Sequence, residues 1–180
     1  LVNIQHGIED AYQGRKPLLS TEESAGIQQK FARKQQEKRL QKTREMMIRN
    51  RKAADDFLKE NGKKDGVQTT ASGLQYKLIK AGDGATPKAD DTVKVQYRGT
   101  LLNGTEFDSS YKRGKPAVFS VNQVIPGWTE ALQLMKVGSK YRIFLPPVLA
   151  YGDRGAPPVI APGSMLIFDV ELVDIVKKKK

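Results

Sequence analysis

From residue 21 to residue 61 the 180-residue chain contains no proline and a single glycine, Gly26. Gly62 follows this run directly and supplies a stop signal. Ser20 and Glu23 have the spacing of a capping box, in which the first residue caps a helix. We therefore expect one long helix over residues 20–61, which would span about 60 Å at 1.5 Å per residue.

The middle of this expected helix is polar on every side. Between Arg33 and Glu45, Leu40 is the only strongly apolar residue, and no sustained heptads are present. Such a helix usually bridges two bodies through solvent. The sequence predicts a charged stalk over 20–61, preceded by an N-terminal helical dimerisation segment over 1–19. A homodimer formed through residues 1–31 is expected.

The formal net charge of +11 lies mainly outside the body of the chain. Residues 66–176 carry +2, whereas residues 1–65 carry +5 and the basic tail, residues 177–180, carries +4. The basic stretch of the stalk, residues 30–52, can bind nucleic acid or an anionic membrane surface, or it can be a solvated helix surface. No aromatic residues interleave with its charges, so the solvated surface is favoured and nucleic acid is not an expected partner.

Several kinds of site are excluded by composition. The chain has no cysteine and one histidine, His6, so disulfides, thiolate nucleophiles and cysteine- or histidine-based metal sites are not expected. No apolar run approaches the roughly 20 residues that span a bilayer, so no transmembrane segment is expected. Leu1 is not followed by the basic and apolar regions of a signal peptide.

Residues 66–176 show the alternation of half-buried strands. Asn103 and Gly104 form a strong hairpin signal, which brings Phe107 and Asp108 back alongside Tyr97. Expected strands cover residues 67–70, 74–79, 92–102, 117–121, 139–145 and 165–173. One short helix follows a Pro-Gly break, with three apolar residues on one face: Trp128, Leu132 and Met135. The pattern predicts an α+β domain.

Most aromatic residues of this domain fall in the expected strands. Taken singly, each is more often a core residue than a site residue. As a set they predict an aromatic cup with Trp128 at its base, because Asp108 directly follows Phe107 and Tyr151 precedes a proline-rich loop. The aromatic residues concerned are Tyr97, Phe107, Phe119, Tyr141, Tyr151 and Phe168.

Five ordered motifs resemble those of the FKBP-type peptidyl-prolyl isomerases. They are Val-Gln-Tyr-Arg-Gly at 95–99, Gly-Thr-Glu-Phe-Asp-Ser-Ser at 104–110, Val-Ile-Pro-Gly-Trp at 124–128, Leu-Ala-Tyr-Gly at 149–152 and Leu-Ile-Phe-Asp-Val-Glu-Leu at 166–172. The helical part before them is similar to the macrophage infectivity potentiator (Mip) subgroup and to periplasmic FKBP chaperones. The resemblance implies a curved antiparallel sheet wrapped around one short helix, preceded by the helical N-terminal segment and stalk.

The resemblance also implies the roles of individual residues. Trp128 would form the floor beneath a substrate proline, and the N–H of Ile125 would bind a substrate carbonyl. The expected substrate-binding residues are Tyr97, Phe107, Asp108, Phe119, Val124, Ile125, Trp128, Tyr151, Val159, Ile160 and Phe168. The expected catalytic residues are Asp108, Tyr151, Phe107, Tyr97 and Phe168. Ala117 stands where the best-known members carry an aromatic residue, which implies a more open wall.

The expected activity is cis–trans isomerisation of X–Pro bonds in flexible polypeptides, by a dimeric folding helper. The resemblance further implies FK506- or rapamycin-type macrolide ligands and a periplasmic, outer-membrane-associated or secreted location in a Gram-negative bacterium. Bond rotation needs no nucleophile, metal or cofactor. The alternative is a chaperone that binds proline-containing segments without turnover. Asp108 can act on the substrate, or it can be structural, paired with Arg113 or hydrogen bonded to Tyr97.

Overall fold

The computed structural model describes residues 12–14 and 21–176. Most of the expected N-terminal helix, the capping residue Ser20 and the basic tail lie outside the described residues. Backbone contacts divide the chain into two compact units, residues 1–43 and residues 44–180. Each unit is considered by itself below.

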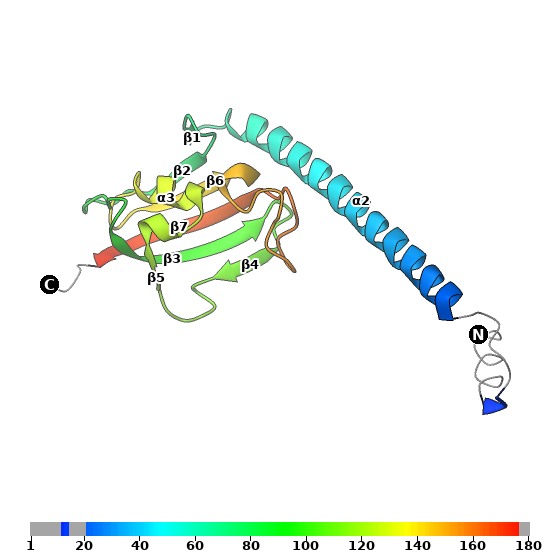
Figure 1. Ribbon diagram of the computed structural model, residues 1–180. Helices are drawn as coiled ribbons and strands as arrows, with labels where there is room; N and C mark the ends of the chain where they lie inside the picture. Colours follow the sequence, from blue (N-terminus) through cyan, green and yellow to red (C-terminus); the bar gives the residue numbers. More distant parts are fainter. Residues whose placement is uncertain (1–11, 15–20, 177–180) are drawn as a thin grey trace. The chain divides into compact units, whose positions relative to one another are not determined.

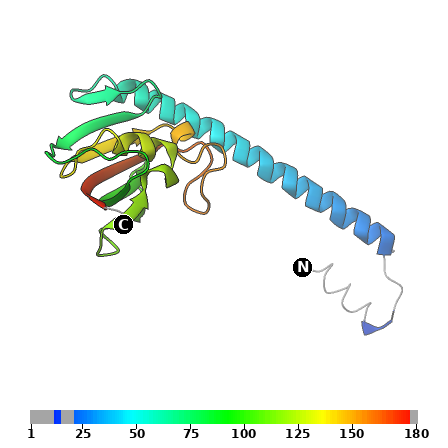
Figure 2. The same ribbon diagram turned by 60° about the vertical axis from the view of Figure 1, so that its left-hand side comes forward.

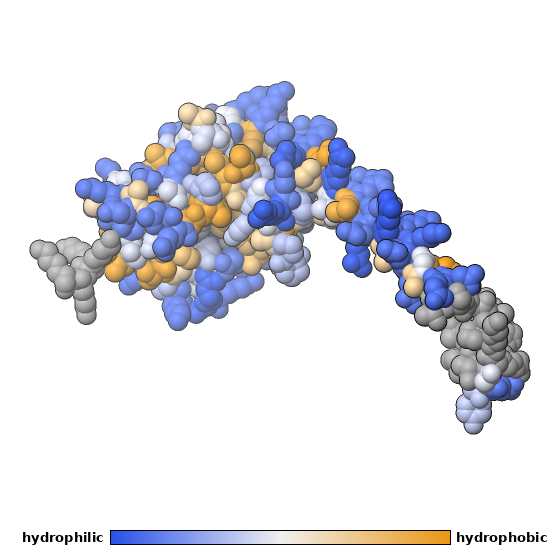
Figure 3. Space-filling view, in the orientation of Figure 1, coloured by the Kyte–Doolittle hydropathy of each residue, from blue (hydrophilic) through white to orange (hydrophobic). Residues whose placement is uncertain are grey.

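One helix, α2, covers Thr21–Asn61 without interruption. Hydrophilic residues cover most of its visible surface (Figure 3). Ile27 and Phe31, four residues apart on the first part of the helix, are 53% and 63% exposed. No helix in the described ranges combines the length and apolarity needed to cross a membrane.

The second unit contains a seven-stranded sheet, curved in Figure 1, in the order β1-β2-β6-β7-β3-β4, with β5 pairing to β3. The strands are β1 (Val67–Thr69), β2 (Gln75–Lys80), β3 (Thr92–Leu101), β4 (Glu106–Ser109), β5 (Ala117–Ser120), β6 (Lys140–Leu145) and β7 (Leu166–Val176). All strand pairs are antiparallel. Short 3₁₀ turns, η1 (Val121–Gln123) and η2 (Pro147–Leu149), precede the two segments that complete the site.

One face of the sheet is covered by the short helix α3 (Pro126–Leu132), as Figures 1 and 2 show. Trp128, Leu132 and the following Met135 are buried against strand residues that include Val95 and Val170. The three apolar residues of the expected helix thus share the main core. The expected fold class, a long helix followed by an antiparallel sheet around one short helix, is confirmed.

The other face of the sheet is covered by the last turns of α2. Phe144 of β6 and Ile167 of β7 are paired across the strands and point away from the main core, because their neighbours in each strand belong to it. Ala54, Phe57 and Leu58 pack there, with the Phe57 and Phe144 ring centroids 5.8 Å apart. The end of α2 is therefore part of the globular unit.

Buried polar contacts fix the end of α2 at the start of β2. Asn61 Nδ2 donates to Gln75 Oε1 at 2.9 Å, and Gln75 Nε2 donates to the carbonyl of Leu58 at 2.8 Å. Gln75 opens β2, so the last turn of the helix and the first residue of the strand share one hydrogen-bonded group. Buried amides of this kind need hydrogen-bond partners, and Gln75 finds them in the side chain of Asn61 and the carbonyl of Leu58.

Candidate active site

A pocket of about 430 Å³ opens between α3, the β3–β4 hairpin and the segment after η2. Ten residues line it: Tyr97, Phe107, Asp108, Phe119, Gln123, Val124, Ile125, Trp128, Tyr151 and Phe168. Nine of them are residues that the sequence analysis named for substrate binding. Gln123, at the end of η1, is the one that it did not name.

Trp128 lines this pocket and is almost completely buried. Its ring meets those of Tyr97, Phe119 and Phe168 edge to face, with centroid separations of 5.1, 5.7 and 5.3 Å. The indole N–H has no hydrogen-bond partner among the residues that the structure describes. The orientation of the ring is thus set by aromatic packing, for which edge-to-face geometry is favourable.

The turn into α3 places Trp128 against the sheet. Pro126 opens the helix, where its fixed φ suits the first turn. At Gly127 an added Cβ would lie 2.5 Å from Leu145 Cδ2, so a larger residue would require the Leu145 side chain of β6 to shift. Ile125 precedes the helix, and its carbonyl accepts hydrogen bonds from the N–H groups of Trp128 at 2.9 Å and Thr129 at 3.2 Å.

A second glycine sets the opposite wall. Gly99 of β3 pairs with Asp108 of β4 and with Phe168 of β7. An added Cβ there would lie 2.7 Å from both Phe107 Cζ and Phe168 Cε1. These two rings meet edge to face, with centroids 5.5 Å apart, directly over the missing side chain.

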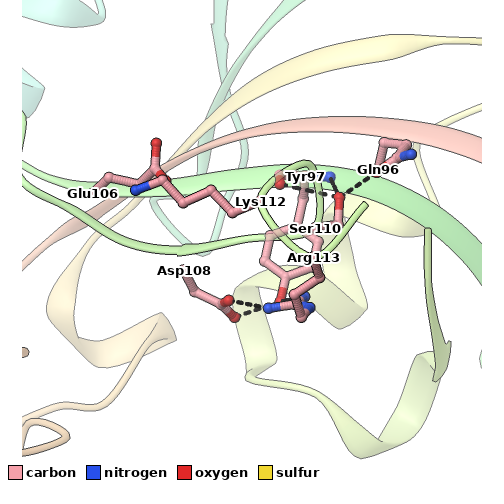
Figure 4. Close-up of polar contacts among 7 residues, drawn as sticks. All are labelled: Gln96, Tyr97, Glu106, Asp108, Ser110, Lys112 and Arg113. Atoms are coloured by element: carbon pink, nitrogen blue, oxygen red, sulfur yellow. Dashed lines mark hydrogen bonds and ion pairs between the residues drawn. The ribbon is translucent and has the colours of Figure 1, made fainter. Parts of the chain in front are cut away.

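The polar side of the pocket is a three-residue cluster, drawn in Figure 4. Arg113 forms an ion pair with Asp108 Oδ1, and the Tyr97 hydroxyl donates to Asp108 Oδ2. Arg113 Nη2 also donates to the Tyr97 hydroxyl at 2.7 Å, and its guanidinium lies 5.3 Å from the centroid of the Tyr97 ring. Both structural partners that the sequence left open for Asp108 are therefore present.

Hydrogen bonds behind the cluster fix Tyr97. The backbone N–H of Tyr97 donates to Ser110 Oγ at 2.8 Å, and the N–H of Ser110 donates to the Tyr97 carbonyl at 2.9 Å. Ser110 Oγ donates in turn to Gln96 Oε1, as Figure 4 also shows. The segment that carries Asp108 and Arg113 is thereby joined to the strand that carries Tyr97.

The cluster determines the protonation of its members. Partial burial raises the pKa of Asp108, but hydrogen bonds from Tyr97 and Arg113 outweigh this effect, so the pKa lies below its ordinary value of 3.8. Burial, followed by the hydrogen bond to Asp108, raises the pKa of Tyr97 above 10.0. At neutral pH Asp108 is therefore an anion and Tyr97 a neutral hydrogen-bond donor.

The segment after η2 holds three of the expected site residues in different surroundings. Tyr151 lines the pocket and is 41% exposed. Val159 is exposed, and Ile160 is buried in the main core, where its N–H donates to the carbonyl of Ala156 at 3.0 Å. Neither Val159 nor Ile160 is among the residues that line the pocket.

Metal-binding geometry does not occur in the parts of the chain that the structure describes: no three His, Asp or Glu side chains gather there as ligands. The ionisable residues of the pocket are Asp108 and two tyrosines, Tyr97 and Tyr151. The arrangement can take an apolar ring, present one fixed carboxylate to it and offer the hydroxyl of Tyr151 as a hydrogen-bond partner.

Family models match the chain in two adjoining parts. The FKBP-type peptidyl-prolyl cis-trans isomerase model matches residues 84–173, and the model of the domain amino terminal to it matches residues 1–78. The chain therefore belongs to the FKBP-type peptidyl-prolyl cis-trans isomerase family. Its amino-terminal part places it with the members that carry this additional domain.

Individual relatives agree with this assignment. The chain is 48% identical over 97% of its length to the FKBP-type isomerase FkpA of Aeromonas hydrophila, and 45% identical over 97% to the outer membrane protein MIP of Legionella longbeachae. The chain covers 64% of the Aeromonas hydrophila protein, less than two thirds of its length, and 75% of the Legionella longbeachae protein. The crystal structure of FkpA from Escherichia coli superposes with a TM-score of 0.85, at 40% identity, over 96% of this chain and 80% of that one.

Replacing Gly99 by Ala is expected to narrow the pocket. The added methyl group would push Phe107 or Phe168 toward the cavity, so prolyl-peptide affinity should fall by about tenfold while the sheet remains folded. Titration of the fluorescence of Trp128, the only tryptophan, measures this affinity. Unchanged affinity in Gly99→Ala would contradict the packing described.

The low pKa of Asp108 predicts how acid changes the stability of the folded chain. Because the folded-state pKa lies below that of the unfolded chain, the stabilisation from this group is present above the unfolded value and is lost as pH falls through the folded value. Carboxyl ¹³C shifts should give Asp108 a midpoint below 3.8, and Arg113→Gln should raise it. Lys115→Gln, an exposed cation on the same loop, is the control. A midpoint that does not move in Arg113→Gln would show that Arg113 does not lower the pKa of Asp108.

Proposed function

We propose that this chain is a peptidyl-prolyl cis–trans isomerase that acts on X–Pro bonds in unfolded or flexible polypeptides. The observation that supports it most is the pocket itself, with apolar walls, an indole base and one carboxylate held at its rim. A proline ring is apolar and compact, and the imide before it carries the bond that must rotate.

The physical basis of the activity is the polarity of the amide. Rotation about the C–N bond costs about 18–20 kcal/mol because resonance is lost in the twisted state. The planar imide is more charge-separated than the twisted one, so moving it from water to an apolar pocket disfavours the planar form. A barrier lower by about 7 kcal/mol accelerates rotation by about five powers of ten. Only interactions that are stronger for the twisted imide contribute to this gain.

Asp108 acts in this proposal as a fixed negative charge. Its Oδ2 accepts a hydrogen bond from Tyr97, and its Oδ1 is ion-paired with Arg113. Its low pKa opposes proton uptake. It is thus suited to orienting the imide electrostatically and not to acting as a general base. Tyr151 offers its hydroxyl, and Ile125 its backbone N–H, as hydrogen-bond donors to a substrate carbonyl.

The aromatic walls have the second role. Tyr97, Phe107 and Phe168 surround the space above Trp128 and exclude water from the rotating bond. Phe119, Val124 and Ile125 complete the surface against which the proline ring lies. FK506- and rapamycin-type macrolides are proposed to occupy the same space.

Exchange NMR on a short X–Pro peptide tests the activity. The full chain should speed cis–trans exchange far above the buffer rate, and Phe107→Ala or Asp108→Ala should lower kcat/KM by at least about tenfold. Leu78→Ala, an exposed apolar residue of β2 outside the pocket, is the control. Folded protein that leaves the exchange at its buffer rate would reject catalysis. Saturable peptide binding in that case would indicate the non-catalytic chaperone.

We further propose a homodimer that associates through residues 1–31 and serves as a folding helper in the envelope of a Gram-negative bacterium. Ile27 and Phe31 support this proposal, since two large apolar side chains on one helical face are exposed. A dimer would present two pockets to one client polypeptide. A client bound in one pocket would then meet the other pocket at a raised effective concentration.

Light scattering checks the association. We expect twice the 20.0 kDa of one chain for the wild type and a single-chain mass for the double variant Ile27→Asp, Phe31→Asp. Leu40→Asp, which changes an exposed residue in the polar middle of α2, should remain dimeric. Isomerisation of short peptides should persist in all three proteins. A wild type that has the mass of one chain at micromolar concentration contradicts the proposed dimer.

A further inference from the structure

The proline-rich loop of residues 152–163 connects the pocket to the second half of α2. Tyr151, which lines the pocket, directly precedes the loop. At the other end of the loop, Pro162 and Gly163 lie against α2. All of these residues, with the part of α2 concerned, belong to the unit of residues 44–180.

Three contacts join the helix to the loop. Asn50 Nδ2 donates to the carbonyl of Pro162 at 2.8 Å in a partly buried site. Gly163 has a φ of +71°, and an added Cβ would lie 2.7 Å from the carbonyl oxygen of Met47. Arg51 forms an ion pair with Asp153, but both side chains are half exposed, so this pair contributes little. Met47, Asn50 and Arg51 have the i, i+3, i+4 spacing of one helical face.

Hydrogen bonds within the loop carry this anchorage to the pocket. The N–H of Gly163 donates to the carbonyl of Gly152 at 3.0 Å, which ties the end of the loop to its beginning. Ala156 and Ile160 exchange two further backbone bonds of 2.8 and 3.0 Å. Gly152, held from one side by Gly163, is the residue that follows Tyr151. These bonds connect Pro162 and Gly163 to the backbone next to Tyr151.

We propose that the turn of α2 at residues 47–51 positions Tyr151 through the 152–163 loop, with Asn50 as the principal positioning residue. This inference rests on the proposed binding of prolyl peptides in the pocket. The helix in this view does more than connect two parts of the chain, since one of its turns holds a wall of the site. Asn50 touches neither the pocket nor the reacting bond.

Loss of the Asn50 hydrogen bond should change the binding of the peptide more than the rate of bond rotation. Without the Asn50 hydrogen bond the loop samples more conformations, and the peptide must order it on binding. Loss of such uniform binding raises KM and leaves kcat nearly unchanged, whereas damage to the catalytic groups lowers kcat. One neutral hydrogen bond corresponds to about a fivefold change in affinity.

Asn50→Ala and Asn50→Asp test the inference in the full chain. Aspartate keeps the shape of asparagine but, when ionised, has no donor for the Pro162 carbonyl. Both variants should raise KM for an X–Pro peptide, and its Kd from Trp128 fluorescence, by about fivefold, with kcat within twofold of wild type. Lys52→Ala is the matched control, because Lys52 lies on the same helix and its ammonium pairs with Asp56 of that helix.

A second readout follows the loop itself. Amide hydrogen exchange at Gly163 and Gly152 should accelerate in both Asn50 variants and stay unchanged in Lys52→Ala. Unchanged exchange and unchanged KM in the Asn50 variants would overturn the inference, as would a fall in kcat with KM constant. Lack of isomerisation by the wild type would reject the proposed function instead. The two failures are therefore distinguishable.

Discussion

The site depends on how one indole is packed. Trp128 has no hydrogen-bond partner in the described structure for its N–H, and three aromatic rings meet it edge to face. Each ring comes from a different strand, so β3, β5 and β7 together hold the indole of the short helix in place. Because these strands also form the main core, the shape of the pocket is built into the fold before any ligand arrives.

The groups around Trp128 are of two kinds, apolar rings and one polar cluster. Phe107 and Phe168 close over Gly99, while Arg113 holds Asp108 and Tyr97 in one hydrogen-bonded cluster. The cluster keeps a negative charge at the edge of an otherwise apolar space. That combination suits a reaction in which charge separation changes along the path although no covalent bond is broken. The membership of the chain in the FKBP-type family agrees with this chemistry.

Much of this was predictable from the sequence, because alternation and turn signals are local. Asn103 and Gly104 mark the hairpin, whereas nine of the ten lining residues follow from the resemblance to the FKBP-type family. The second face of the sheet was not predicted: Phe144 alternates out of the main core, and only the apolar end of α2, far away in sequence, explains its burial. The 152–163 loop lacks any period, so neither the placement of Val159 and Ile160 nor the Asn50 contact could be predicted. For Arg113 the sequence offered an ion pair among alternatives, and geometry had to decide.

The central claim is that a substrate proline lies on Trp128 while its imide twists. Intermolecular NOEs between a bound, isotope-labelled X–Pro peptide and the full chain test it most directly. The account predicts contacts from the proline ring protons to the indole of Trp128, with further contacts to Phe107 and Phe168. Accelerated isomerisation of a peptide whose proline shows no contact with this indole would contradict it.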